Sequence, residues 1–305
     1  MEGAASREHT FDCTSSGRRI CCGRHSGSGT SQEWHTLSRD QVSRRRYGRG
    51  RAVPGRDLLL GRPGDGRRSG AKAFYGGLFG WEFDDLPTGD KGTYTICRLG
   101  GKAVAGLYDR AEEASWGSYI KAEDVDGVAR RARELGAEVL VEPFDAPGGA
   151  RVATVRDPAG AVVSLSRPGE QFAAEVVNQD GAWTWNELVA PDLAAAVAFY
   201  RELLGWGAAD IPGAVARTSF SLGELLVGGG HTPIGPEDPT PRWTISFWVA
   251  DADRCVERAR ELGGGVVLPP MDIPVGRFAI LGDPGGAAFT VSAVPGGPLR
   301  GVDGS

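Results

Sequence analysis

The stretch "WTWNELV" at residues 183–189 places a carboxylate among indoles. If it is an extended strand, alternate side chains point the same way, so Trp183, Trp185 and Glu187 share one face. A carboxylate beside tryptophans is expected to have a raised pKa, and it could transfer a proton or bind a cationic ligand. A carboxylate at a solvent-open mouth would have the same sequence, so both interpretations of Glu187 stay open.

Three further residues have side chains suited to a site, but each also has a plain structural explanation. His231 is the only histidine after residue 70 and follows three glycines in "GGGHTPIGPEDPTP", which indicates an exposed loop residue without a partner nucleophile or second ligand. Arg151 and Arg277 occupy matched places before two predicted strands. They could bind an anionic group, but salt bridges at the rim of a site explain them equally well.

The first 70 residues differ in composition from the rest of the 305-residue chain. They carry 14 arginines, no lysine and seven acids, a net charge of +7, although the whole chain has −5. Gly, Ser and Arg replace large apolar residues there, so burial cannot offset the entropy lost on ordering. We therefore expect residues 1–56 to be a disordered or mis-specified N-terminal extension.

Two functions of this extension are weaker alternatives. "SRRRYGRGR" at 43–51 could contact phosphates, but a run of charge is usually only solvated, so we predict no nucleic-acid partner. A zinc site is also not expected, because no closed tetrahedral pattern fits the spacing of Cys13, Cys21, Cys22, His25 and His35.

The sequence also predicts no membrane partner. Its apolar runs stop short of the roughly 18–20 residues that span a bilayer, and the first thirty residues lack the apolar segment of a signal peptide. We therefore expect a cytoplasmic protein.

The chain repeats itself after residue 70. "KAFYGGLFGWEF" at 72–83 returns as "VAFYRELLGWGA" at 197–208, and "RARELG" at 131–136 returns at 258–263. Such a repeat predicts two structural copies. We expect a first module at 57–167, a linker at 168–181, a second module at 182–295 and a tail at 296–305.

Each copy carries signals of the same elements. Asp192 is expected to cap a helix that ends at Gly205, and Asp251 a helix that ends at Gly263. "TISFWVAD" at 244–251 alternates as a half-buried strand does. "DPAG" at 157–160 and "DPGG" at 283–286 are typical of turns between two closing strands.

The phrase "AFYxxLxGW" and the closing "DPxG" hairpin resemble the vicinal oxygen chelate superfamily, which includes glyoxalase I, extradiol dioxygenases and bleomycin-resistance proteins. The resemblance covers about three quarters of the chain, with the two copies aligned over residues 72–167 and 197–293. It implies an α+β fold in which two tandem βαβββ modules form an open, cupped mixed β-sheet with helices outside. The repeated phrase would be the outer helix and turn of each half-cup, with its aromatic residues in the core.

Metal-using members of this superfamily place one ligand on the first strand and a glutamate on the closing strand. Carried onto this chain, counting from the aspartates of "PDL" and "DPxG", these positions are Trp185, Ser164 and Thr290. None of the three is a good metal ligand. The resemblance therefore implies a metal-free cup, and we expect no metal and no cofactor.

Residues of both copies are expected to line this cup. The candidate catalytic residue is Glu187, and the substrate-binding candidates are Trp185, Trp183, Ser164, Thr290, Trp248 and Tyr119, with Ser246 and Lys121 completing the wall. Such a wall is aromatic on one side and lightly polar on the other. It suits a small, flat, partly aromatic metabolite with a few oxygens.

Two functions follow from the resemblance. One is an accessory enzyme of secondary metabolism, of the hydroxylase or lyase/isomerase type, that uses metal-independent acid–base chemistry or assists an oxygenation. The alternative is a non-catalytic resistance protein that sequesters a drug or metabolite. Either would bind a small-molecule ligand, as a monomer with paired modules or as a homodimer.

The first copy lacks an obvious opening strand. The residues aligned with "AWTWNELVAPDL" at 182–193 read "DLLLGRPGDGRR" at 57–68, in which only residues 57–60 could pair. We therefore expect an incomplete first half-cup. A further hypothesis is that residues 1–70 are an out-of-frame or wrongly started reading of the gene.

Overall fold

A computed structural model describes residues 54–60, 65–88, 92–109, 114–146, 149–169, 174–213, 215–234, 239–273 and 276–294. Most of the expected N-terminal extension and the expected tail at 296–305 lie outside the described residues. Within the described ranges, no helix has both the length and the apolar character needed to cross a membrane.

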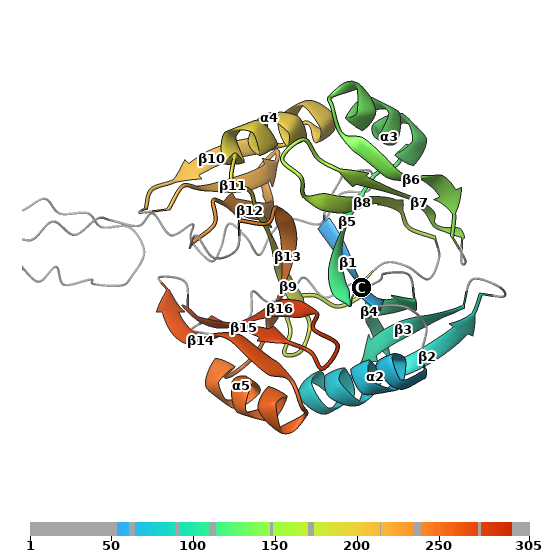
Figure 1. Ribbon diagram of the computed structural model, residues 1–305, viewed down its shortest axis with the longest axis vertical. Helices are drawn as coiled ribbons and strands as arrows, with labels where there is room; N and C mark the ends of the chain where they lie inside the picture. Colours follow the sequence, from blue (N-terminus) through green and yellow to red (C-terminus); the bar gives the residue numbers. More distant parts are fainter. Residues whose placement is uncertain are drawn as a thin grey trace, which may run out of the picture. The chain divides into compact units, whose positions relative to one another are not determined.

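The first repeat folds into a mixed sheet of eight strands, called sheet A, with two helices (Figure 1). Its strand order is β2-β3-β4-β1-β5-β8-β7-β6. At its centre β1 and β5 run antiparallel, and each has a parallel outer neighbour, β4 or β8. Its elements are β1 (Pro54–Leu60), α2 (Asp65–Phe79), β2 (Glu82–Pro87), β3 (Thr93–Leu99), β4 (Lys102–Asp109), β5 (Ser115–Lys121), α3 (Val125–Glu134), β6 (Glu138–Asp145), β7 (Arg151–Arg156) and β8 (Val162–Arg167).

The second repeat forms sheet B with the same topology, in the order β10-β11-β12-β9-β13-β16-β15-β14. Its central pair is β9 and β13. Its elements are β9 (Trp183–Val189), α4 (Leu193–Leu204), β10 (Gly207–Ile211), β11 (Arg217–Leu222), β12 (Leu225–His231), β13 (Arg242–Trp248), α5 (Ala252–Glu261), β14 (Gly265–Ile273), β15 (Gly276–Gly282) and β16 (Ala288–Ala293).

The α+β fold and the tandem repeat are confirmed, but each repeat is larger than expected. Within the described residues each sheet contains two successive βαβββ units, as in β9-α4-β10-β11-β12 followed by β13-α5-β14-β15-β16. Each repeat therefore holds two βαβββ units instead of the one expected, and each repeat forms a sheet of its own. The central antiparallel strands join the two units of a repeat, so each repeat completes its own sheet.

The predicted helix ends are confirmed. The carboxylates of Asp192 and Asp251 each accept the backbone N–H three residues on, at the starts of α4 and α5. These bonds satisfy a donor that the first turn leaves unpaired. Gly205 follows α4 at φ 67° and Gly263 follows α5 at φ 82°, a left-handed conformation that glycine adopts without a side-chain clash.

The repeated tyrosine links the two repeats. Tyr200 of α4 donates its Oη–H to Oδ2 of Asp157, in the first repeat's Asp-Pro turn, at 2.8 Å. Nε1 of Trp243 donates to the same Oη at 2.8 Å. Burial raises the pKa of Asp157, although Tyr200 and the turn's backbone N–H groups donate hydrogen bonds to its carboxylate. We call such a Trp–Tyr–Asp chain a clasp.

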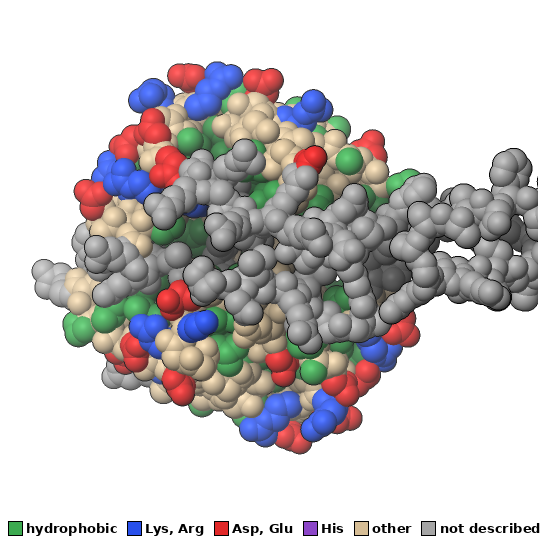
Figure 2. Space-filling model, turned by 180° about the vertical axis from the view of Figure 1, so that it is seen from behind, with side chains coloured by type: hydrophobic (Ala, Val, Ile, Leu, Met, Phe, Trp, Pro, Cys, Tyr) green, Lys and Arg blue, Asp and Glu red, His purple; other side chains and the backbone are tan. Residues whose placement is uncertain are grey.

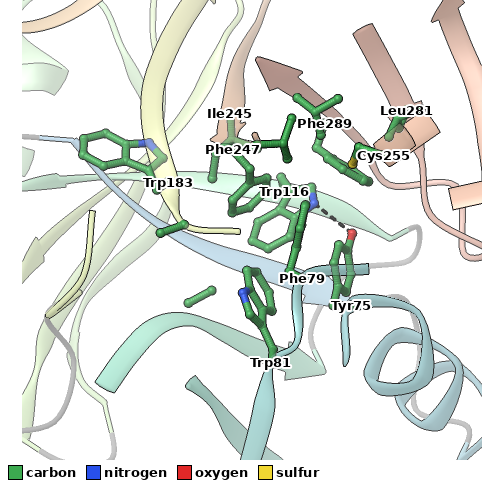
Figure 3. Packing of buried hydrophobic residues seen from close by; sticks show 14 of the residues in the cluster. Tyr75, Phe79, Trp81, Trp116, Trp183, Ile245, Phe247, Cys255, Leu281 and Phe289 are labelled. Carbon is green, nitrogen blue, oxygen red and sulfur yellow. Dashed lines mark hydrogen bonds between the residues drawn. The ribbon is translucent and has the colours of Figure 1, made fainter. Parts of the chain in front are cut away.

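A second clasp runs in the opposite direction. Tyr75 of α2 donates to Oδ2 of Asp283 at 3.1 Å. Nε1 of Trp116 donates to Tyr75 Oη at 3.0 Å, the hydrogen bond drawn in Figure 3. The first helix of each repeat, α2 or α4, is thus hydrogen-bonded through its tyrosine to the Asp-Pro turn of the other repeat. This reciprocal contact explains why the chain carries the "AFY" phrase twice.

The two large core clusters also mix the repeats. In one, Phe79 at the end of α2 packs with Phe247 of β13 and Phe289 of β16, at ring-centroid distances of 5.1 and 6.0 Å (Figure 3). In the other, residues of α3 and β6–β8 pack with residues of α4 and β10–β12. The helices accordingly lie in pairs, α2 beside α5 and α3 beside α4, on the outside of the sheets (Figure 1).

Helices α2 and α5 pack closely against each other. At the α2–α5 contact Nε of Arg258 donates to the carbonyl of Gly77 at 3.2 Å, and a Cβ at Gly77 would lie 2.7 Å from Leu262. Glycine therefore permits this close approach.

The outer surface of the molecule carries mixed charge. On the face shown in Figure 2, acidic and basic side chains are interspersed at the upper and lower edges, rather than separated into patches of one sign.

The opening strand of the first repeat is present. β1 starts at Pro54, three residues before the predicted start of the module, and pairs with both β4 and β5. The expectation that only residues 57–60 could pair is therefore wrong. Proline is tolerated as the first residue of a strand, and hydrogen-bonding neighbours on both sides hold a segment of poor strand propensity. Sheet A therefore has its full set of strands.

Candidate functional site

The side of sheet B that faces away from the core is defined by strand alternation. Phe289 and Val291 of β16 lie in the core cluster, so Thr290 between them points to the other side. A Cβ at Gly229 would lie 3.3 Å from Nε1 of Trp185 and 3.4 Å from Cγ of Glu187. Both side chains therefore cover Gly229 on one side of the sheet. We call this side the B face; it carries Trp185, Glu187, His231, Ser246, Trp248 and Thr290.

Three strands of the B face bring Trp185 and Thr290, two of the three positions at which the resemblance to the superfamily placed metal ligands, into one row with Ser246. Ser246 of β13 pairs with Trp185 of β9 on one side and with Thr290 of β16 on the other. An indole and two neutral hydroxyls do not fit the nitrogen, sulfur and carboxylate ligands that divalent transition metals take in proteins. Among the described residues there is also no group of three or more His, Cys, Asp and Glu placed to hold a metal ion.

Trp183 does not lie beside Trp185. Ser246 pairs with Trp185, but the next residue, Phe247, pairs with Trp183, so β9 has one extra residue at this point. This β-bulge reverses the alternation. Trp183 turns into the core cluster with Phe247, is 8% exposed, and donates from Nε1 to Oδ1 of Asn186. The prediction that Trp183 lines the site is therefore wrong.

Tyr119 and Ser164 lie on the other sheet. They are paired neighbours on β5 and β8, and the residues beside them, Ile120 and Leu165, lie in the core. Tyr119 and Ser164 thus point to the corresponding side of sheet A, which we call the A face. The prediction that they share one cup with Trp185 and Thr290 is wrong, because each repeat forms a complete sheet.

Polar groups on the A face are paired with one another. Ser164 Oγ lies 3.1 Å from Oγ1 of Thr154, and Nζ of Lys121 lies 3.0 Å from Oε1 of Glu123. Tyr119 also has an interaction partner. The hydroxyl of Ser164 and the ammonium group of Lys121 are thus already engaged on this face.

The B face leaves more of its polar groups unpaired. Among the residues that the structure describes, the hydroxyls of Ser246 and Thr290 have no hydrogen-bond partner, and Ile280, which pairs with Thr290, offers none. Nε1 of Trp248 is buried and has no acceptor in the part of the chain that the structure describes. Unpaired donors beside apolar side chains are what a binding site presents before its ligand arrives.

Charged groups lie next to this row. Nη2 of Arg217, on β11, is 3.7 Å from Oε1 of Glu187, and both side chains are about one third exposed, at 38% and 30%. The described residues donate no hydrogen bond to the Glu187 carboxylate. Glu187 is thus available to a ligand from the B face.

His231 is a residue of the B face that the sequence analysis missed. It ends β12, is 8% exposed, and is the direct neighbour of Arg217 on β11. A Cβ at Gly230 would meet the core residues Leu193 and Phe220, so His231, the next residue, points to the B face. The expectation of an exposed loop histidine is wrong. The repeat could have shown this, because His231 occupies the strand position in sheet B that Tyr108 occupies in sheet A.

Arg151 and Arg277 are rim residues. Two nitrogens of Arg151 donate to the carboxylate of Asp126 at the start of α3, and Arg277 makes the same paired contact with Asp253 at the start of α5. These contacts lower the pKa of both aspartates. Both guanidinium groups are therefore engaged in salt bridges, as one of the two interpretations expected.

Comparison with known proteins agrees with this architecture. The model of the Glyoxalase/Bleomycin resistance protein/Dioxygenase superfamily matches residues 69–165 and 184–291. The Mycobacterium tuberculosis protein CFP32, which carries the name glyoxylase, is 38% identical over 236 residues, or 73% of this chain and 89% of CFP32. The anthracycline biosynthesis protein DnrV of Streptomyces peucetius is 36% identical over 237 residues, or 72% of this chain and 86% of DnrV.

Solved structures show the same fold at lower identity. A Mn(II)-bound glyoxalase from Novosphingobium aromaticivorans has a TM-score of 0.55 at 18% identity, with 80% of this chain and 82% of that chain covered. The 2,3-dioxygenase LapB from Pseudomonas sp. KL28 has a TM-score of 0.55 at 14% identity, with 81% and 93% covered. From the matched regions and the curated relatives, the chain belongs to the Glyoxalase/Bleomycin resistance protein/Dioxygenase superfamily.

Proposed function

We propose that this protein binds a small, flat, oxygenated aromatic metabolite of secondary metabolism on its B face, without a metal ion ligated by the chain. The observation that carries the proposal is the row formed by Trp185, Ser246 and Thr290 across three adjacent strands. The indole offers a surface for stacking, and the two hydroxyls can bond to oxygens of the ligand.

The surroundings of this row support an aromatic ligand. Ile280 and Phe278 of β15 continue the B face beyond β16, because Ala279 and Leu281 between and beside them lie in the core. Both side chains are partly exposed. The B face is therefore apolar toward β15, lightly polar along the row, and charged toward β11. A fused-ring molecule with oxygens on one edge matches that gradient.

The relatives favour the same ligand class. DnrV and DauV, at 36% and 35% identity, are named for anthracycline biosynthesis. Anthracyclines are built on fused aromatic rings that bear quinone and hydroxyl oxygens. A comparable ring system is therefore the first ligand to test.

Titration with an anthraquinone tests the proposal. Trp185→Ala should weaken binding by about tenfold or more, because it removes the stacking surface. Tyr119→Ala, which removes the central aromatic ring of the A face, is the matched control and should leave the affinity within about twofold. Affinity unchanged by Trp185→Ala, or lost only after removal of a bound metal with a chelator, would disprove the proposal.

Glu187 distinguishes an accessory enzyme from a sequestering protein. Its carboxylate accepts no hydrogen bond from the described residues and lies beside the proposed ring site, where it could accept a proton from a bound ligand. In an enzyme, Glu187→Gln should abolish turnover and keep binding within a few-fold. If the wild type binds the ligand and returns it chemically unchanged, sequestration is the function.

A further inference from the structure

One corner of the B face holds a carboxylate, a guanidinium group and an imidazole side by side. Glu187 of β9, His231 of β12 and Arg217 of β11 lie on three neighbouring strands and point to the same side. Gly229 of β12 is the register partner of Glu187, and the Glu187 side chain lies over it, two residues before His231 on the same strand. The three groups therefore act on the same part of a bound molecule.

Arg217 sets the charge of this corner. Its Nη2 lies 3.7 Å from Oε1 of Glu187, which is close enough for charge compensation but longer than a hydrogen bond. The guanidinium thus cancels most of the attraction that an isolated Glu187 would exert on a cation. The carboxylate oxygens still keep their capacity to accept hydrogen bonds, because the described residues donate none to them.

His231 presents an acceptor of its own. Its Nδ1 lies 2.7 Å from the carbonyl oxygen of Thr232, and a carbonyl oxygen only accepts, so Nδ1 carries the hydrogen. In the neutral ring Nε2 is then an acceptor. Within the described residues Nε2 has no partner, and it is not among the buried atoms that lack one, so it reaches solvent. This contact with Thr232 also fixes the orientation of the ring.

We infer that this corner selects a neutral ligand that carries a hydroxyl group at the end nearest β12, with Glu187 and His231 as the accepting residues and Arg217 as the group that disfavours a cation. The inference rests on the proposed function and adds the orientation and charge of the ligand. The ring system lies toward Trp185 and Ile280, and the hydroxyl end lies toward His231.

Three matched probes test the inference. They are anthraquinones that carry one hydroxyl, methoxy or aminomethyl group at the same outer ring position, titrated at a pH at which the phenol is neutral. The wild type should bind the hydroxyl probe about tenfold more tightly than the methoxy probe, which cannot donate a hydrogen bond. The aminomethyl probe, a cation, should bind no more tightly than the methoxy probe.

Variants of the corner assign the effect. Glu187→Ala and His231→Phe should each remove most of the hydroxyl probe's advantage and leave the methoxy probe within about twofold. His231→Gln keeps an acceptor and should retain part of the advantage. Arg217→Gln should improve binding of the aminomethyl probe by about tenfold, because Glu187 then lacks compensation. Tyr108→Phe, at the strand position of His231 in sheet A, is the control.

Each outcome separates the inference from the proposed function. A wild type that prefers the aminomethyl probe, or a hydroxyl advantage that persists in both Glu187→Ala and His231→Phe, would overturn the inference while the binding function stands. If the wild type binds none of the three probes, the proposed function fails and the inference fails with it.

Discussion

Sheets A and B have the same strand order, but the faces that they turn away from the core differ. Where the B face has Arg217 and His231, the A face has Tyr94 and Tyr108, whose rings lie 6.3 Å apart. With Ile96 these tyrosines form a small apolar cluster on β3 and β4. The A face is thus apolar over β3 and β4, whereas the B face is charged over the corresponding strands β11 and β12.

On the other side of the central strands the difference is reversed, because there the A face is polar and the B face is apolar. In the A face Thr154 bonds to the hydroxyl of Ser164, whereas in the B face Ile280 lies beside the hydroxyl of Thr290. The clasps, in contrast, use the same three residue types in both halves. This contrast indicates that the contacts joining the repeats dictate residue type at the core, while the two faces can hold different chemistry.

The largest expected effect tests whether the two clasps are equivalent. Asp157→Ala and Asp283→Ala should each lower the free energy of unfolding by about 3 kcal/mol, because each leaves a buried tyrosine hydroxyl and turn N–H groups without an acceptor. Urea denaturation would measure both. A loss in one variant at least twice that in the other would show that the clasps are not equivalent.

An exchange between the faces sharpens their difference. Ile280→Thr places a hydroxyl beside Thr290, as Thr154 lies beside Ser164 in the A face. Thr290 would gain a hydrogen-bond partner, and the apolar part of the B face at β15 would lose methyl groups. Affinity for the methoxy anthraquinone should fall about threefold to tenfold. The reciprocal Thr154→Ile in the A face should leave affinity unchanged; a comparable loss there would mean that the A face also binds.

The repeated tryptophans at the helix ends give a smaller difference. Nε1 of Trp81 donates to the carbonyl of Gly181 at 2.9 Å, whereas Nε1 of Trp206 is buried and finds no acceptor among the described residues. Trp81→Phe should therefore destabilise the protein by about 1 kcal/mol more than Trp206→Phe, since the packing losses are similar. Thermal or urea unfolding of the two variants measures this, and equal losses would contradict it.

The pH dependence of stability should show the burial of the clasp carboxylates. Burial raises the pKa of Asp157 in the folded state, so the folded protein holds that proton more tightly than the unfolded chain does. As pH falls from neutrality through the raised pKa, the wild type should gain stability relative to Asp157→Asn. A stability difference that is independent of pH, or that moves against the wild type, would contradict the raised pKa.

Local signals in the sequence predicted the helices and the alternation of the closing strands. Asp192, Gly205 and Asp251 have the predicted capping roles, and the residues beside Ser164 and Thr290 face the core as alternation requires. The resemblance to the superfamily predicted the tandem fold. Patterns within one element therefore sufficed to predict features that a single element determines, such as helix caps and the alternation of side chains along a strand.

The errors arose where pairing between distant strands decides the structure. Alternation along β9 cannot reveal the bulge that turns Trp183 into the core, since the bulge exists only relative to β13. The glycines before His231 suggested a loop, yet at Gly228 and Gly230 a Cβ would lie 3.2 Å from the carbonyl oxygen of Asn186 and 3.0 Å from Leu193, so this strand has little room for side chains.

The most direct test of the central claim is a crystal structure of the protein with the hydroxyl-bearing anthraquinone. The account predicts the ring system against Trp185 and Ile280, oxygens near Ser246 and Thr290, and the hydroxyl at His231. A ligand bound between Tyr94 and Tyr108 on the A face, or held through a metal ion at the Trp185 row, would contradict it.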